Sequence, residues 1–211
     1  MSKTLLQVNA SLFADAGAST TLANEFVANW RAHNPGAAVL VRDFARDPVP
    51  HLTAERFQAF LTKPEERTAA QQAHAAYSDA LIEELKRADV VVLGVPMYNF
   101  DVPSTLKAYF DHIARAGVTF RYTAQGAVGL LSGKKVYIFA ARGGYYVGQP
   151  SDTQSAYLRT FLGFLGLNDV EFVYAEGLAI SAEIKQSALS QARDEIVRLD
   201  MRVDERVPVA A

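Results

Sequence analysis

The sequence contains no cysteine, and this absence removes several kinds of chemistry. A chain without thiols forms no disulfide framework, holds no thiolate zinc site and offers no cysteine nucleophile. A run of Lys and Arg is also missing, and the formal net charge of the 211 residues is −2. Because nucleic-acid-binding proteins show a basic patch or stripe, no nucleic-acid partner is predicted. Any redox activity of this chain therefore needs a cofactor.

Long apolar runs are absent as well. Residues 4–8 are largely apolar, but Asn9 ends this opening run before the core of a signal peptide could form. Nothing approaches the roughly 20 apolar residues that cross a bilayer. The sequence thus predicts a soluble protein without membrane contact, and the cytoplasm is its expected location. With 50% hydrophobic and 21% charged residues, the composition is that of an ordinary globular protein, and we expect one domain over residues 1–211.

Strand-like and helix-like segments alternate along the chain. Five short apolar runs predict strands, at residues 4–8, 39–41, 90–95, 136–140 and 172–174. Helical spacing predicts a helix with Ser19 or Thr20 available as its N-cap. Further helices are predicted from about Thr53, with a break near Pro64, and from Pro103, Tyr157 and about Ala182. The alternation predicts an α/β fold, a doubly wound parallel sheet of five strands in the order 2-1-3-4-5.

Ligands of such sheets bind outside the carboxyl ends of the strands, near the point where the strand order reverses. This rule selects the loops after the first, third and fourth strands. The first of them, residues 9–19, is made of small and hydroxyl residues and runs into a helix N-terminus, which favours an anion. Ser11 and Ser19 are the side chains that we expect on a phosphate. The alternative is that Ser19 only caps the helix and Ser11 only makes the turn.

The second loop has an unusual composition, with a proline, a thioether, two aromatics and an amide: Pro96, Met97, Tyr98, Asn99 and Phe100. Turns are normally small and polar. This segment can lie along a flat ring system, with Asn99 hydrogen-bonding the ring edge. The alternative is that Tyr98 and Phe100 pack under the following helix as ordinary core.

The third loop follows an apolar strand and begins Ala141, Arg142, Gly143, Gly144. Paired glycines let the backbone approach a ligand closely and aim N–H groups at it. Such donors would stabilise negative charge on a reduced ring. The alternative is a glycine turn before a mobile loop.

Together the three loops resemble those of the FMN-dependent NADH azoreductases, relatives of the NAD(P)H:quinone oxidoreductases. The likeness covers nearly the whole chain and is carried by residues 96–100, 106–107, 109–111, 114–123, 133–135, 142–144, 157–158, 160–164 and 175–177. It implies a flavodoxin-like fold and a homodimer with tightly bound FMN at the subunit interface. The implied FMN contacts are Ser11, Gly17, Ala18 and Ser19 for the phosphate, Pro96 to Phe100 for the ring, and Ala141, Arg142, Gly143 and Gly144 for the ring edge.

Two departures from the family pattern are visible. The family often has Ser-x-Ser where this chain has Gly17-Ala18-Ser19, and Ser-Arg-Gly-Gly where it has Ala141-Arg142-Gly143-Gly144. One hydroxyl is missing at each place. Because backbone donors serve both positions, we expect an altered FMN affinity rather than its loss.

The resemblance also implies the activity. NADH would reduce FMN, and the reduced flavin would pass a hydride to a quinone or to an aromatic azo compound, which two such cycles cleave to amines. One stacking slot for both substrates implies ping-pong kinetics. No protein side chain is assigned to the chemical step. The expected aromatic walls are Tyr122, Phe120 and Phe164 from the neighbouring subunit, with Tyr145 and Tyr146 as a lid.

Other interpretations stay open. A flavodoxin-type carrier would hand electrons to protein partners, although such carriers tend to be strongly acidic, and a regulatory module would have lost its flavin. His33, His51, His74 and His112 lack metal-ligand spacing, so surface or packing roles and no metal are expected. The sequence does not decide between NADH and NADPH, for which Arg56, Lys63 or Arg67 would have to bind the 2′-phosphate.

Overall fold

Strands and helices alternate in the computed structural model, which describes the backbone of residues 3–204 and the side chains of residues 3–199. In chain order the elements are β1 (Thr4–Asn9), η1 (Ala14–Ala16), α1 (Ala18–His33), β2 (Ala38–Asp43), α2 (Ala54–Leu61), η2 (Pro64–Glu66), α3 (Ala69–Arg87), β3 (Val90–Pro96), α4 (Ser104–Ile113), β4 (Phe120–Thr123), β5 (Gly126–Gly129), β6 (Lys135–Ala141), α5 (Thr153–Leu165), β7 (Asp169–Ala175) and α6 (Ala182–Asp204).

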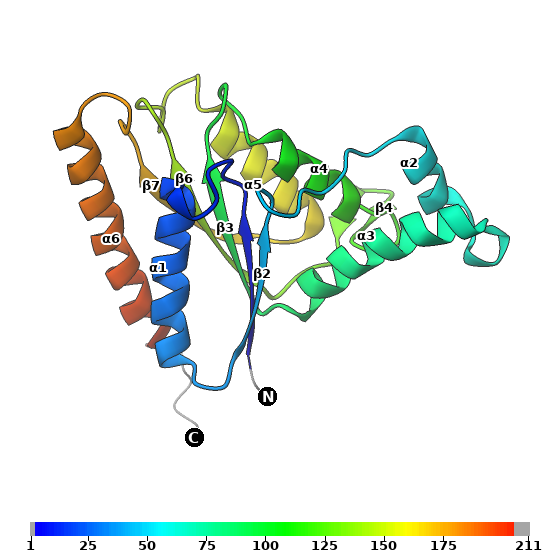
Figure 1. The fold of residues 1–211 in the computed structure, drawn as a ribbon. Helices are drawn as coiled ribbons and strands as arrows, with labels where there is room; N and C mark the ends of the chain where they lie inside the picture. The colour runs from blue at the N-terminus through cyan, green and yellow to red at the C-terminus, as the bar shows by residue number, and fades with distance from the viewer. Residues whose placement is uncertain (1–2, 205–211) are drawn as a thin grey trace.

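Five strands form a parallel sheet in the order β2-β1-β3-β6-β7. This is the predicted order 2-1-3-4-5 of the sheet strands, so the predicted fold is confirmed. β3 is the middle strand, and its residues 91–96 are all buried because helices cover both faces of the sheet. α1 and α6 lie on one face, and α3, α4 and α5 lie on the other (Figure 1). Each face has its own core of buried apolar side chains.

Local sequence signals set the ends of several helices. Thr68 and Gln71 form a capping box at the start of α3, since each side chain accepts a hydrogen bond from the other residue's backbone N–H. Asp152 caps α5, because its Oδ1 accepts from the Ser155 N–H at 3.0 Å. Gly166 ends α5 in the left-handed region, with φ +94°. α5 therefore begins four residues before Tyr157, where the sequence predicted its start.

The predicted N-cap of α1 is wrong. Gly17 holds the N-cap position, so Ser19 and Thr20 lie inside the first turn and neither side chain caps the helix. A Cβ at residue 17 would lie 2.1 Å from the Oγ of Ser11, so this loop has room only for glycine while Ser11 keeps its place. The chain thus enters the helix two residues earlier than it would with Ser19 as the N-cap.

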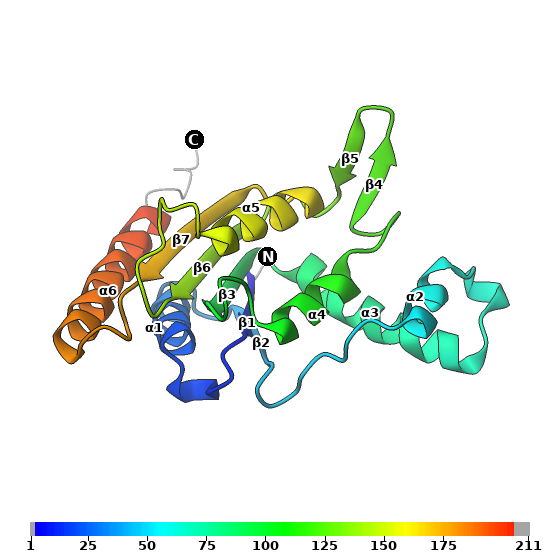
Figure 2. The same cartoon turned by 90° about the horizontal axis from the view of Figure 1, so that it is seen from above.

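β4 and β5 form a separate antiparallel hairpin that the sequence did not predict. Figure 2 shows it projecting from the end of α5. The base of the hairpin lies directly against that helix end, because a Cβ at Gly129 would be 2.0 Å from the Gly166 nitrogen. The Leu131 N–H also donates to the Leu165 carbonyl at 2.9 Å.

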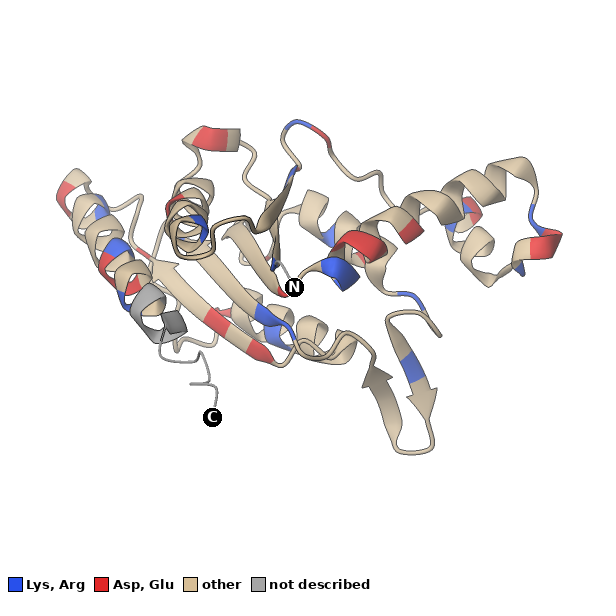
Figure 3. Ribbon diagram, turned by 90° about the horizontal axis from the view of Figure 1, so that it is seen from below, with Lys and Arg blue, Asp and Glu red and all other residues tan. Residues whose placement is uncertain are grey.

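Charge and hydropathy are distributed without extremes over the described part of the chain. Figure 3 shows acidic and basic residues interspersed along α6, whereas the charged residues of α3 lie in its C-terminal half. None of the helices in residues 3–204 is both long and apolar enough to cross a lipid bilayer.

Candidate functional site

The carboxyl ends of β1, β3 and β6 are neighbours in the sheet, so the loops that follow them share one edge. We call these the β1 loop (10–17), the β3 loop (97–103) and the β6 loop (142–152). The Leu12 N–H donates to the Tyr98 hydroxyl at 3.3 Å, which joins the β1 and β3 loops. The Met97 N–H donates at 2.9 Å to the carbonyl of Ala141, the last residue of β6 before its loop. The structure thus brings together the three loops that the sequence selected.

The β1 loop packs tightly around Ser11. This side chain is buried, and its Oγ accepts a hydrogen bond from the Phe13 N–H at 3.2 Å. The hydroxyl lies where a side chain at residue 17 would otherwise stand. Leu12 and Phe13, in contrast, are exposed at 61% and 68%. The loop therefore encloses a hydroxyl and presents two apolar side chains outward.

The first turn of α1 holds two buried hydroxyls that have no partner. Ser19 and Thr20 are fully buried, and within the described residues no hydrogen-bond partner exists for Ser19 Oγ or Thr20 Oγ1. The same turn carries the unpaired N–H groups that every helix N-terminus has, together with the positive end of the helix dipole. A phosphate group would satisfy these donors. Sequence reasoning selected Ser19 but missed Thr20, for which the threonine next to a predicted phosphate serine was the available signal.

The β3 loop turns back sharply on itself. Tyr98 and Asp101 exchange backbone hydrogen bonds, both at 3.1 Å. Between them, Asn99 and Phe100 have positive φ angles of 50° and 69°, as in the two-residue turns that favour Asn and Gly. A phenylalanine in this region is strained. Such strain persists where the surrounding structure holds it, and it often marks a functional loop.

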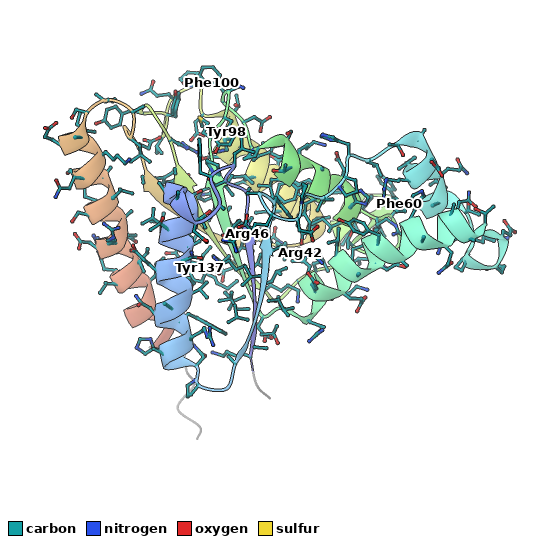
Figure 4. All side chains as sticks on the ribbon, in the orientation of Figure 1. Arg42, Arg46, Phe60, Tyr98, Phe100 and Tyr137 are labelled. Atoms are coloured by element: carbon teal, nitrogen blue, oxygen red, sulfur yellow. The ribbon has the colours of Figure 1, made fainter. Side chains whose placement is uncertain are left out.

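The side chains of the β3 loop are not ordinary core. Phe100 is 53% exposed, Asn99 is exposed, and Met97 and Tyr98 are half-buried. Figure 4 shows Tyr98 and Phe100 at the carboxyl edge of the sheet. The alternative in which both aromatics pack under the next helix is therefore wrong. Pro96 is the last residue of β3 and is buried, so it borders the loop instead of lying within it.

Two hollows flank the β3 loop. A groove of about 730 Å³ runs between the β1 loop and α4, and it is lined by Leu12, Met97, Tyr98, Asn99, Asp101, Val102, Pro103, Ser104 and Lys107. A smaller hollow of about 220 Å³ separates the β3 and β6 loops and is lined by Met97, Asn99, Phe100, Gly143 and Tyr146. Met97 and Asn99 line both, so the β3 loop lies at the centre of the open space.

In the β6 loop, the carbonyls of two glycines accept hydrogen bonds, whereas their N–H groups remain available to a ligand. The carbonyls of Gly143 and Gly144 accept hydrogen bonds from Ala179 at 3.0 Å and from Gly177 at 2.9 Å. Within residues 3–204, no acceptor is recorded for the N–H groups of these two glycines. Donors in this arrangement favour a negatively charged or carbonyl group.

Arg142 was predicted to contact a cofactor, but its polar groups are already engaged. Its side chain is fully buried between Asp152 at 3.0 Å and Glu176 at 3.2 Å. The backbone N–H donates to Ala175, and the carbonyl accepts from Leu178. Ala141 ends β6 and is 7% exposed. Sequence reasoning missed Glu176, whose partners cannot be read from the sequence.

The three predicted aromatic walls lie together, away from the loops. Phe120, Tyr122 and Phe164 lie together at the hairpin base, with ring centroids 4.2 Å apart for Phe120 and Phe164. Tyr122 is 75% exposed, whereas Phe120 is buried. α5 touches the β3 loop at its N-terminus, and Phe164 lies eleven residues further on, about 16 Å at 1.5 Å per residue. The three rings thus lie a helix length away from the loops of their own chain.

Tyr146, which was predicted as part of a lid, lies beside the β3 loop of its own chain. Its ring makes an edge contact with Phe100, with centroids 5.9 Å apart, and its N–H donates to Glu176 at 2.8 Å. Tyr145, the other predicted lid residue, is 60% exposed.

None of the four histidines of the sequence belongs to the three loops. His112 is fully buried, with Phe60 and Tyr77 edge-on to its ring and its Nε2 3.0 Å from the Pro50 carbonyl. Burial lowers the pKa of His112, and the hydrogen bond to Pro50 offsets part of this effect. Over the described residues, no group of three His, Cys, Asp or Glu side chains could hold a metal ion. The absence of a metal stays a prediction.

The candidates for a 2′-phosphate lie on the segment of α2 and η2. The Arg67 Nε donates to the carbonyls of Ala59 and Thr62, both at 3.1 Å, and Lys63 pairs with Glu66 at 3.7 Å. Arg56 lies on α2.

Known proteins resemble this chain over most of its length. The FMN-dependent NADH:quinone oxidoreductase of Cellvibrio japonicus is 61% identical over 193 residues, which cover 92% of this chain and 96% of that protein. The protein of the same name from Burkholderia thailandensis is 55% identical over 193 residues, which cover 92% of this chain and 98% of that protein. Among solved structures, an FMN-dependent NADH-azoreductase from Bacillus anthracis in complex with FMN is 27% identical, with a TM-score of 0.83 over 94% of this chain and 99% of that one.

The parallel sheet and the three loops at its point of reversal define a flavodoxin-like α/β protein. A family model described as a flavodoxin-like fold matches residues 3–199. With these relatives, the chain belongs to the family of FMN-dependent NADH:quinone oxidoreductases within the flavodoxin-like fold. This finding confirms the resemblance drawn from the sequence.

Proposed function

We propose that this protein is an FMN-dependent NADH oxidoreductase that reduces quinones and cleaves aromatic azo compounds. The observation that carries the proposal is the pair of buried, unpartnered hydroxyls of Ser19 and Thr20 at a helix N-terminus, beside two loops that leave apolar side chains and amide donors open. The names of the relatives support FMN, NADH and a quinone. The azoreductase structures support azo compounds as a second substrate class.

The residues of the three loops fit FMN part by part. We assign the phosphate to Ser11, Gly17, Ala18 and Ser19, and we add Thr20. Pro96, Met97, Tyr98, Asn99 and Phe100 border the ring, and Ala141, Gly143 and Gly144 meet its edge. Arg142 does not contact FMN through its side chain, because its guanidinium forms salt bridges with Asp152 and Glu176. It supports the loop around the ring edge instead. FMN, when bound, supplies the chemistry by accepting a hydride from NADH and passing it to the second substrate.

The chain's own groups provide binding and charge stabilisation. The open N–H groups of Gly143 and Gly144 stabilise negative charge that develops at the ring edge. Met97 and Asn99 border both hollows, so one slot serves NADH and the second substrate in turn. One slot for two substrates gives ping-pong kinetics, and complete cleavage of an azo bond takes two rounds of NADH.

A homodimer completes this slot in our proposal. Tyr122 is 75% exposed on the projecting hairpin, at a distance that prevents it from serving the loops of its own chain. A second copy related by a two-fold axis would present its hairpin to these loops, with Phe164 and Phe120 behind Tyr122. The proposed dimer buries exposed apolar residues of both copies.

The test is an absorption spectrum of the purified protein, before and after anaerobic addition of NADH. We expect yellow flavin bands that bleach, followed by steady consumption of NADH when menadione or methyl red is added. A colourless protein that takes up no added FMN would overturn the proposal. Bleaching without turnover of either acceptor would instead identify an electron carrier.

A further inference from the structure

A buried polar network lies directly beneath the two ring loops. Its centre is Arg142, whose guanidinium is fully buried, donates to Ser155 Oγ at 2.8 Å and lies over the Tyr174 ring at 4.8 Å. Asp152 and Glu176 balance its charge. Burial acts to raise the pKa of Asp152, but hydrogen bonds from Ser155 and Arg142 outweigh this effect and hold the pKa below its ordinary value.

Gln154 connects this network to the β3 loop. The side chain is fully buried at the start of α5, and its Oε1 accepts a hydrogen bond from the Arg142 Nε at 3.3 Å. Its Nε2 donates to the Pro96 carbonyl at 2.9 Å and to the Asp101 carbonyl at 3.1 Å. These two carbonyls stand at the two ends of the loop that carries residues 97–100. One amide group therefore bridges the two ends of the β3 loop.

Glu176 makes the matching connection to the β6 loop. Its Oε1 accepts hydrogen bonds from the N–H groups of Tyr146 at 2.8 Å and Val147 at 3.0 Å, and it also pairs with Arg142. The chain of contacts thus runs from one loop through Gln154, Arg142 and Glu176 to the other. Thr153 adds an outer contact, because its Oγ1 donates to the Phe100 carbonyl.

This network is more than a means of stabilising the fold. Burying a guanidinium and two carboxylates is costly, and apolar residues of similar volume often stabilise a protein as well or better. A fully bonded polar network instead fixes one geometry. Here it fixes the spacing of two loops, one of which contains the strained residues Asn99 and Phe100.

We propose that Gln154 is a positioning residue for the flavin ring: through its bonds to Pro96, Asp101 and Arg142 it sets the separation of the β3 and β6 loops, and with it the affinity and the potential of the coenzyme. The proposal rests on the proposed function, since it assumes that FMN lies between these loops. Gln154 does not touch the reacting atoms in this scheme. It acts through the backbone of the loop that does.

The test compares apoproteins of the wild type, Gln154→Met and Thr153→Val. Gln154→Met keeps the length and the neutral charge of the side chain but removes both donated bonds. We expect its dissociation constant for FMN, measured by fluorescence titration, to rise about tenfold or more. The midpoint potential of the bound flavin should also shift. Thr153 is exposed, so Thr153→Val should fold normally and change both quantities in the same direction by a smaller amount.

Gln7→Met is the matched control. Gln7 is also buried, and its Nε2 also donates to two oxygens, the Oδ1 atoms of Asn9 and Asn24. These are side-chain atoms, so Gln7 does not bridge the two ends of a loop. We expect this variant to lower the melting temperature without moving the potential. If Gln154→Met and Thr153→Val bind FMN with the wild-type affinity and potential, the inference is overturned while the proposed function stands. If wild-type apoprotein takes up no FMN, both are overturned.

Discussion

At the scale of single residues, the hydroxyl of Ser19 is buried and has no hydrogen-bond partner among the described residues, which is unfavourable unless a ligand supplies one. We therefore predict opposite effects of Ser19→Ala on two quantities. The free energy of unfolding of the FMN-free protein should rise by about 1 kcal/mol, because an unsatisfied hydroxyl is lost and alanine favours the helix. FMN binding should weaken about tenfold. Chemical denaturation of the apoprotein and an FMN titration measure the two effects.

Tyr109→Phe is the control for Ser19→Ala. The Tyr109 hydroxyl is also buried, with no hydrogen-bond partner in residues 3–199, but it lies on α4 in the core and outside the three loops. Its removal should stabilise the apoprotein and leave FMN binding unchanged. Equal affinity of Ser19→Ala and wild type for FMN would speak against a phosphate at this helix end.

His112 makes the stability of the protein depend on pH. Burial lowers its pKa below the ordinary 6.5, so the unfolded chain takes up a proton at a pH where the folded chain does not. Its contribution to stability is therefore complete above about pH 6.5 and is lost as the pH falls from there toward the folded-state pKa. His112→Gln keeps a donor for the Pro50 carbonyl but does not titrate. We predict that the free energy of unfolding falls less steeply for this variant below pH 6.5.

Urea titrations at a series of pH values measure this slope. Parallel pH profiles of His112→Gln and wild type would refute the prediction.

Individual residues show where sequence reasoning stops. The hydroxyl and glycine residues of the loops could be found because their chemistry suits a phosphate and a ring edge. The salt bridges of Arg142 with Asp152 and Glu176 could not be predicted, because these partners lie 10 and 34 positions away in the sequence and meet only in the fold. The same holds for Gln154, which looks like any polar residue of a helix.

At the scale of elements, the strands and their order were predictable, because continuous apolar runs such as that of β3 mark strands buried on both faces. The hairpin of β4 and β5 was not. Its strands have four residues each, β5 begins and ends with glycine, and most of the residues are exposed, so no alternation of apolar and polar residues marks it. Its position depends on the contact between Gly129 and Gly166, which is visible only in the fold.

The N-terminus of α1 gives a prediction at this scale. Ala18 is the first residue of the helix and is half-buried. A carboxylate there interacts favourably with the helix dipole, so Ala18→Glu should stabilise the apoprotein by about 0.3–1 kcal/mol. The same charge would repel the phosphate of FMN. We expect the dissociation constant for FMN to rise at least about tenfold.

Ala18→Gln separates charge from size, because glutamine has the shape of glutamate without its charge. It should bind FMN more tightly than Ala18→Glu, and the difference between the two should shrink at high salt. Unimpaired FMN binding by Ala18→Glu, measured at low salt, would place the phosphate elsewhere.

At the scale of the whole molecule, the separation of Tyr122 from the loops of its own chain decides between two arrangements. α5 begins at the β3 loop and ends at the hairpin, so its length keeps the two apart in one copy. In the proposed dimer, a complete slot consists of the loops of one copy and the Tyr122 of the other. A site shared between two subunits can be tested by mixing two defective variants, each of which carries the part of the site that the other lacks.

We predict that Tyr122→Ala and Ala18→Glu restore activity when their subunits are exchanged. Under random pairing about half of the dimers are mixed, and each has one site with intact loops and an intact tyrosine, so about a quarter of all sites regain full turnover. The reciprocal control mixes wild type with the double variant. If Tyr122 acts across the interface, both sites of every mixed dimer are damaged, and activity falls to about a quarter of that of the wild type alone. If Tyr122 acts within its own chain, the reciprocal mixture keeps about half, and the first mixture shows only the mean of its two parents. Steady-state turnover of NADH with menadione, at an FMN concentration that saturates only the wild-type site, distinguishes the two results.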